Sequence, residues 1–142
     1  MKRCLAVVVI AGLVVAGLAG SATRAAQGGK KVDTRVFELR TYHANPGKMD
    51  ALNARFREHT NKLFVKHGMT LIGYWNPLGK EAQQKLIYIL AYPSKDAADR
   101  SWEGFRNDPD WKAARAKSEE NGALVAKVES VYMSPTDYSP IK

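Results

Sequence analysis

The feature that most constrains the fold is an order of strand, helix and strand that occurs twice in the second part of the chain. Apolar residues alternate in the strand segments and recur every three or four residues in the helical ones. This order predicts the split βαβ arrangement of ferredoxin-like folds, an α+β domain with a four-stranded antiparallel sheet. The six predicted segments are 34–43, 46–67, 69–75, 85–92, 94–117 and 125–133.

The first residues of the chain have the layout of a signal peptide. Lys2 and Arg3 precede an apolar block over residues 5–19, and small residues follow up to position 25. A membrane-spanning helix needs about 20 apolar residues, so we expect residues 1–25 to be cleaved rather than to stay as a membrane anchor. Residues 26–33 are then a flexible lead-in. The mature protein is expected to be exported, to the periplasm or the medium.

Composition limits the function classes that are open to the mature domain, residues 34–138 with a short tail over 139–142. Cys4, the single cysteine, lies in the leader, which leaves no thiol for a disulfide, a metal site or a nucleophile. The formal net charge of +8 falls to about +5 without the basic residues of the leader. The remaining basic residues are interleaved with acids, as Glu58 and Lys62 are, whereas nucleic-acid binding needs a clustered basic stripe. We therefore expect no nucleic-acid partner.

The sheet is predicted to have a second apolar face that its own helices do not cover. Residues 85–92 are apolar or aromatic on both sides, which is typical of a central strand covered on both faces. An apolar patch above roughly 400 Å² is seldom left exposed on a soluble monomer. We therefore expect a homodimer that forms through this face of the sheet. The residues expected there are Ile72, Tyr74, Tyr88, Leu90, Tyr92, Val131 and Met133.

Short motifs follow one another in a fixed order over nearly the whole mature domain. They are Val36-Phe-Glu-Leu-Arg-Thr-Tyr42, Pro46-Gly-Lys48, His67-Gly-Met69, Gly73-Tyr-Trp75, Tyr92-Pro-Ser94, Asp108-Pro-Asp-Trp111 and Ser134-Pro-Thr136. Together they resemble the NIPSNAP family. The resemblance implies the dimeric α/β barrel superfamily, in which two ferredoxin-like sheets close around a shared interior. It implies no catalytic residues, because no reaction is firmly established for the family.

Polar side chains on one side of the first strand form the predicted ligand site. Glu38, Arg40 and Tyr42 share that side, and we expect them on the face without helices, inside the barrel. Arg40 could pair with Glu38 along the strand or with Glu129 across it, and so orient a polar group of a small apolar or aromatic ligand. The alternative is a buried ion pair that fixes the dimer register. The aromatic walls of the predicted site are Tyr88 and Tyr92.

The histidines are the remaining candidates for chemistry. His59, on the apolar side of the first helix, is either a hydrogen-bonded core residue or a general base or haem ligand. His67 follows about 12 Å further along that helix, too far to share a metal ion with it. His43 has no partner nearby in the sequence. No phosphate-binding loop, nucleophile elbow or zinc motif is present, so we predict neither cofactor nor metal.

The sequence leaves three functions open. The first is a homodimeric domain that binds a small molecule or mediates protein contacts, without known catalysis. The second, implied by analogy with superfamily relatives, is a cofactor-independent monooxygenase or a haem-binding or haem-degrading enzyme that uses His59. The third is a structural interaction module, which needs neither pocket nor ligand.

Overall fold

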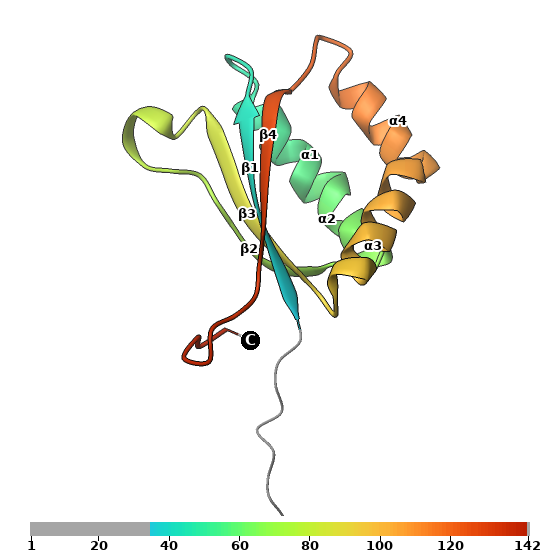
Figure 1. Cartoon of the computed structure of the whole chain (residues 1–142). Helices are drawn as coiled ribbons and strands as arrows, with labels where there is room; N and C mark the ends of the chain where they lie inside the picture. Colours follow the sequence, from blue (N-terminus) through green and yellow to red (C-terminus); the bar gives the residue numbers. More distant parts are fainter. Residues whose placement is uncertain (1–34, 142) are drawn as a thin grey trace, which may run out of the picture. The chain divides into compact units, whose positions relative to one another are not determined.

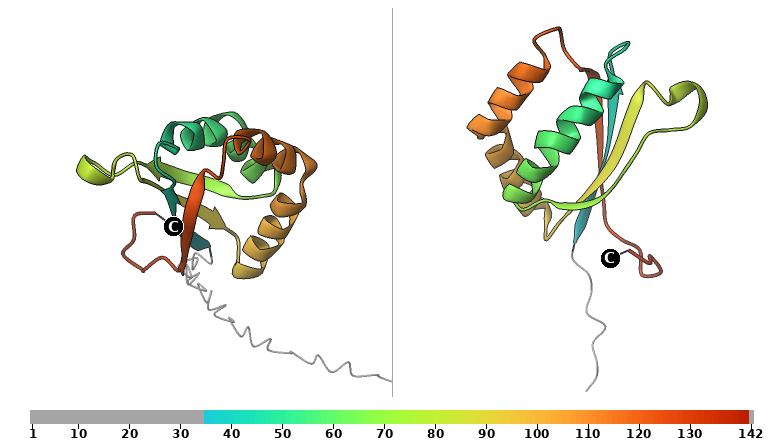
Figure 2. Two further views of the ribbon diagram at one scale, coloured as in Figure 1. Left: turned by 90° about the horizontal axis from the view of Figure 1, so that it is seen from above. Right: turned by 180° about the vertical axis from the view of Figure 1, so that it is seen from behind.

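The computed structural model describes residues 35–141, and the predicted signal peptide and lead-in lie outside these residues. A four-stranded antiparallel sheet has its helices on one face (Figures 1 and 2), which confirms the predicted α+β class. The strand order is β2-β3-β1-β4, so β3 is a central strand as predicted. Within the described residues, no helix combines the length and the apolarity needed to cross a membrane. The elements are β1 Val36–Ala44, α1 Met49–Arg55, η1 Phe56–Thr60, α2 Asn61–Lys66, β2 Thr70–Trp75, η2 Gly79–Glu81, β3 Lys85–Tyr92, α3 Lys95–Asn107, α4 Pro109–Ser118 and β4 Val125–Met133.

Capping residues and one glycine set three of the helix ends. Ser94 Oγ accepts a hydrogen bond from the backbone N–H of Ala97 at 3.1 Å, which begins α3. Asp108 Oδ1 accepts one from the backbone N–H of Asp110 at 2.8 Å, which begins α4. Gly68 has a φ of +80°, the left-handed conformation that lets the chain leave α2. Local chemistry therefore fixes these three boundaries.

The first helix differs from the prediction in its start and in its phase. It begins at Met49 rather than at position 46, because Gly47 has a φ of +72°, outside the helical region. After α1, the π-helical turn η1 adds one residue to the turn, which rotates the following side chains by about 100° around the axis. Thr60 therefore occupies the buried position expected for His59, whose side chain is 51% exposed.

The core lies between the helices and the sheet and is rich in aromatic rings. The Phe64 ring centroid is 5.3 Å from that of Trp102 and 4.8 Å from that of Phe105. Phe105 in turn packs against Trp111 at 4.4 Å. Trp102 and Phe105 thus belong to the core, and the partly buried Trp111 packs against it to complete an aromatic cluster. It joins α3 and α4 to the first helix by contacts that aromatic rings favour.

The face of the sheet that contacts the helices is the opposite of the one we expected. Tyr88 and Leu90 are fully buried beneath the helices, and Tyr92 is 1% exposed. Ile87 and Ile89 alternate with them and point to the other side. The sequence pattern shows which residues share a face, but a strand that is apolar on both sides does not show which face meets the helices.

We call the sheet face without helices the open face. Across it, Leu39 of β1 is paired with Ile89 of β3 on one side and with Val131 of β4 on the other. Val131 is 54% exposed and Trp75 is 51% exposed. Ile72, Val131 and Met133 lie here as predicted, whereas Tyr74 pairs with Tyr88 on the helix side after a bulge in β2. The open face consists of Phe37, Leu39, Ile72, Trp75, Ile87, Ile89, Val131 and Met133.

Candidate ligand-binding site

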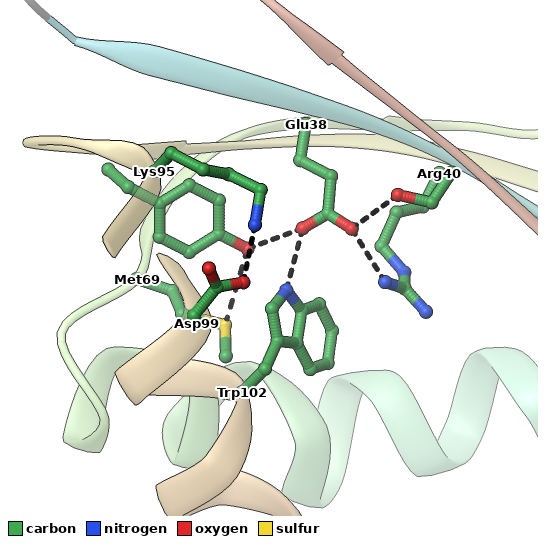
Figure 3. Close-up of polar contacts among 8 residues, drawn as sticks. Glu38, Arg40, Met69, Lys95, Asp99 and Trp102 are labelled. Atoms are coloured by element: carbon green, nitrogen blue, oxygen red, sulfur yellow. Dashed lines mark hydrogen bonds and ion pairs between the residues drawn. The ribbon is translucent and has the colours of Figure 1, made fainter. Parts of the chain in front are cut away.

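Glu38 is the centre of a buried hydrogen-bond network between the sheet and α3 (Figure 3). Its Oε1 accepts hydrogen bonds from Arg40 Nη1 and Ser130 Oγ, both at 2.6 Å. Its Oε2 accepts hydrogen bonds from the Tyr92 hydroxyl and from Trp102 Nε1, both at 2.7 Å. Burial by itself raises the pKa of Glu38, but the hydrogen bonds from Ser130, Tyr92 and Trp102 and the charge of Arg40 outweigh it and hold this pKa below its ordinary value. The carboxylate is therefore ionised at neutral pH.

These contacts leave the Glu38 carboxylate without room for a ligand. Burial, followed by the hydrogen bond to Glu38, raises the pKa of Tyr92, which keeps its hydroxyl a donor. Arg40 stacks on the Trp102 ring, with its guanidinium carbon 4.2 Å from the ring centroid. The expected alternative partner, Glu129, is opposite Thr41 on the open face and therefore cannot reach Arg40. The geometry favours a structural role, in which the Glu38–Arg40 ion pair of β1 holds Trp102 of α3 against the sheet.

Two of the predicted tyrosines lie side by side on the helix-covered face, not on the open face where we expected them. The Tyr42 and Tyr88 ring centroids are 5.3 Å apart. Tyr88 is fully buried, and burial together with the neighbouring Tyr42 raises the pKa of its hydroxyl. Tyr42 is only partly buried and lines a groove that runs beside β4. Tyr42 is thus a predicted site residue that the structure places against an accessible cavity.

This cavity, which we call the β4 groove, lies between β4, α4 and the end of α1 and has a volume of ≈ 250 Å³. Its walls combine two aromatic rings and aliphatic side chains with a small set of charged groups. Such a mixture is typical of sites that hold small ligands in a fixed orientation. The residues that define the groove are Tyr42, Arg55, Trp111, Arg115, Glu119 and Val128.

Ion pairs join three charged groups of the β4 groove, those of Arg55, Arg115 and Glu119. Arg55 is 4% exposed, and its Nη1 donates to Glu119 Oε1 at 2.9 Å and to Ser118 Oγ at 3.2 Å. Arg115 Nε donates to Glu119 Oε2 at 3.1 Å. The Arg55 guanidinium also lies 5.2 Å from the centroid of the Trp111 ring. Burial raises the pKa of Glu119, but its hydrogen bonds to the two arginines outweigh burial and lower that pKa, which keeps the acid ionised.

Sequence reasoning missed this groove, and only part of it left a signal. Arg115 and Glu119 have the i,i+4 spacing of a helical ion pair, which is readable from the sequence. Arg55 comes from a helix far away in the chain, and its approach to Glu119 is set by the packing of α1 against α4. No local pattern predicts that approach.

Each of the three histidines lies beside a different carboxylate. His59, the candidate general base or haem ligand, lies in the π turn η1 with its side chain 51% exposed, which corrects the expectation that it lies on the apolar side of the helix. His43 Nε2 is 3.3 Å from Glu129 Oε1, and His67 Nε2 is 2.6 Å from Asp108 Oδ2. Among residues 35–141, no group of three or more histidine, cysteine or acidic side chains is arranged to hold a metal ion.

The fold and the groove together define a ferredoxin-like α+β domain with a mixed polar and aromatic cavity beside its edge strand β4. The NIPSNAP family model matches residues 37–140, and the chain therefore belongs to the NIPSNAP family. This confirms the resemblance seen in the sequence. A comparison with the curated proteins finds no match.

Solved structures of other proteins share this fold. A NIPSNAP family protein from Agrobacterium tumefaciens is 24% identical, with a TM-score of 0.67 over 76% of this chain and 99% of that one. A NIPSNAP-like domain protein from Burkholderia xenovorans is 17% identical, with a TM-score of 0.66 over 76% of this chain and 90% of that one. SnoaB, a cofactor-independent oxygenase from Streptomyces nogalater, is 11% identical, with a TM-score of 0.52 over 75% of this chain and 98% of that one. At these identities the likeness concerns the fold alone.

Proposed function

We propose that this protein is an exported homodimer that binds a small, partly aromatic molecule in the β4 groove. The observation that carries the binding proposal is the composition of the groove wall. Tyr42 and Trp111 supply flat apolar surfaces, and Arg55 supplies a buried charged group at a fixed position. Known ligand sites combine a mostly apolar lining with a few such polar groups. A purely structural interaction module would need no cavity of this kind.

The open face supports the homodimer. It carries apolar side chains on all four strands, and Val131 and Trp75 are each more than half exposed. Stable interfaces bury about 800 Å² on each partner. Two copies that pack open face against open face would remove this apolar surface from water, which is the main favourable contribution to association. The positively charged apolar leader supports export.

Native mass spectrometry of the purified protein at micromolar concentration tests both proposals. We expect a dimer mass, and a Val131→Lys variant should give a single-chain mass because each interface would then bury an unpaired charge. Val65→Lys is the matched control, since Val65 is 59% exposed but lies on α2, away from the open face. Val128→Trp should fill the β4 groove, and we expect it to abolish the added mass of small aromatic compounds that wild-type protein retains.

Two outcomes of this experiment would contradict the proposals. A single-chain mass for the wild-type protein would exclude the homodimer. Wild-type protein that retains none of a panel of small aromatic compounds, or a Val128→Trp variant that retains them equally well, would exclude binding in the β4 groove.

A further inference from the structure

We propose that the ligand of the β4 groove is a small organic anion, an aromatic or branched aliphatic carboxylate, whose charged group is held by Arg55 and Arg115. This inference rests on the proposed function, because it names the chemical class of the molecule bound there. It follows from the charge balance of the groove wall and from the position of the aromatic rings.

The groove wall carries more positive than negative charge. Arg55 and Arg115 both donate to the same carboxylate, that of Glu119, which is the one acid among the described residues that line the groove. Lys127 also borders the groove, but its ammonium group pairs with Glu129. One guanidinium charge is therefore left without a matching acid. An anionic ligand would supply the missing negative charge.

Arg55 also keeps hydrogen-bonding capacity in reserve. Among the described residues, none accepts a hydrogen bond from its buried Nε. A buried donor without an acceptor is costly, and an acceptor supplied by a ligand would remove that cost. Arg115 is 62% exposed, so its guanidinium can turn toward a bound molecule without unfolding any element. Guanidinium groups bind carboxylates through charge-assisted hydrogen bonds, which are stronger than neutral ones.

The apolar part of the ligand has a defined place in the groove. Tyr42 and Trp111 present aromatic surfaces, and Val128 adds an aliphatic one. The groove volume of ≈ 250 Å³ suits a single ring or a short branched chain. A planar acid would place its ring among these side chains and direct its carboxylate toward the two arginines.

Benzoate and benzamide form a matched pair of probes, because they have nearly the same shape and differ in charge. Titration of the isotope-labelled full protein, followed by NMR chemical-shift changes, gives both the Kd and the location of binding. At low salt we expect benzoate to bind about tenfold more tightly than benzamide, with shifts at the groove residues. Raising the salt concentration should reduce this preference, because it shortens the screening length.

Three variants extend the test. Arg115→Gln should remove most of the preference for benzoate, and Lys112→Gln, on an exposed part of the same helix outside the groove, should leave it unchanged. Glu119→Gln should bind benzoate more tightly than wild type does, since both arginines lose their competing carboxylate.

The outcomes separate this inference from the proposed function. Equal binding of both probes in the groove would overturn the anion preference and leave small-molecule binding intact. Benzoate shifts outside the groove, or a preference that Arg115→Gln does not change, would also overturn the inference. Failure of both probes to bind in the groove would count against the inference and the proposed function together.

Discussion

Replacing Glu38 by glutamine should destabilise the domain strongly, although the two side chains have nearly the same shape. The amide NH₂ group must take the place of one carboxylate oxygen. At the Oε1 position it would meet Arg40 Nη1, and at the Oε2 position it would meet Trp102 Nε1. Both of these groups can donate hydrogen bonds but cannot accept them. Neither orientation of the amide therefore satisfies the network.

The expected loss of stability follows from the burial of these groups. A buried donor without an acceptor costs about 1–3 kcal/mol, and removal of one partner from a buried ion pair costs about 3–5 kcal/mol. These two costs overlap, because Arg40 takes part in both. Its side chain is 16% exposed, so water can compensate part of the loss. We therefore expect a decrease of about 3 kcal/mol in the free energy of unfolding, or about 12 °C in Tm for a domain of this size.

Urea unfolding of wild type and Glu38→Gln, followed by tryptophan fluorescence, measures this difference as a shift of the midpoint at constant slope. The matched control is Glu103→Gln, which removes a carboxylate from the exposed surface of α3 and should change stability by less than about 0.5 kcal/mol. A Glu38→Gln protein within about 1 kcal/mol of wild type would refute the argument that four donors converge on an ionised carboxylate.

The pH dependence gives the same prediction a second readout. The pKa of Glu38 is lowered in the folded protein, whereas an unfolded glutamate titrates near about 4.3. The stabilisation from its charge is therefore fully present above about pH 5 and is lost as the pH falls through the lowered folded pKa. The stability difference between wild type and Glu38→Gln should narrow over this acidic range. A difference that stays constant would show that the charge of Glu38 contributes little.

Two further substitutions test other contacts. Asp108→Asn keeps a capping side chain but loses the charge. Lys66 and then His67 hold the pKa of Asp108 below its ordinary value, so the variant should be less stable than wild type at pH 7. In thermal unfolding, this difference in stability should narrow below about pH 4, where the wild-type carboxylate begins to be protonated in the unfolded chain. An equal deficit at pH 7 and pH 3 would contradict this. Thr60→Val should lower the free energy of unfolding in urea by about 1 kcal/mol, because the Thr60 hydroxyl donates a hydrogen bond to the Arg55 carbonyl at 3.2 Å. A variant as stable as wild type would show that this hydrogen bond contributes little.

Parts of the site could be predicted from the sequence because neighbours along one strand determine them. Glu38 and Arg40 share a face of β1, and their ion pair is one of the two pairings of Arg40 that the sequence left open. The other three donors to Glu38 come from β3, α3 and β4, and their convergence depends on how these elements pack. The position of His59 could not be predicted, because a single π turn in α1–α2 changes every later side-chain direction and leaves no clear pattern in the sequence.

The sequence by itself determined the order of strands and helices, because alternation and helical spacing depend on near neighbours in the chain. The ordered motifs of the sequence indicated the membership of the NIPSNAP family, which the family model shows. Only the tertiary structure decided which face of the sheet meets the helices. Both faces of β3 are apolar, so hydrophobic burial satisfies either choice locally, and the packing of whole elements selects one. The same packing brings Arg55 to Glu119 and so creates the groove on which the proposed function depends.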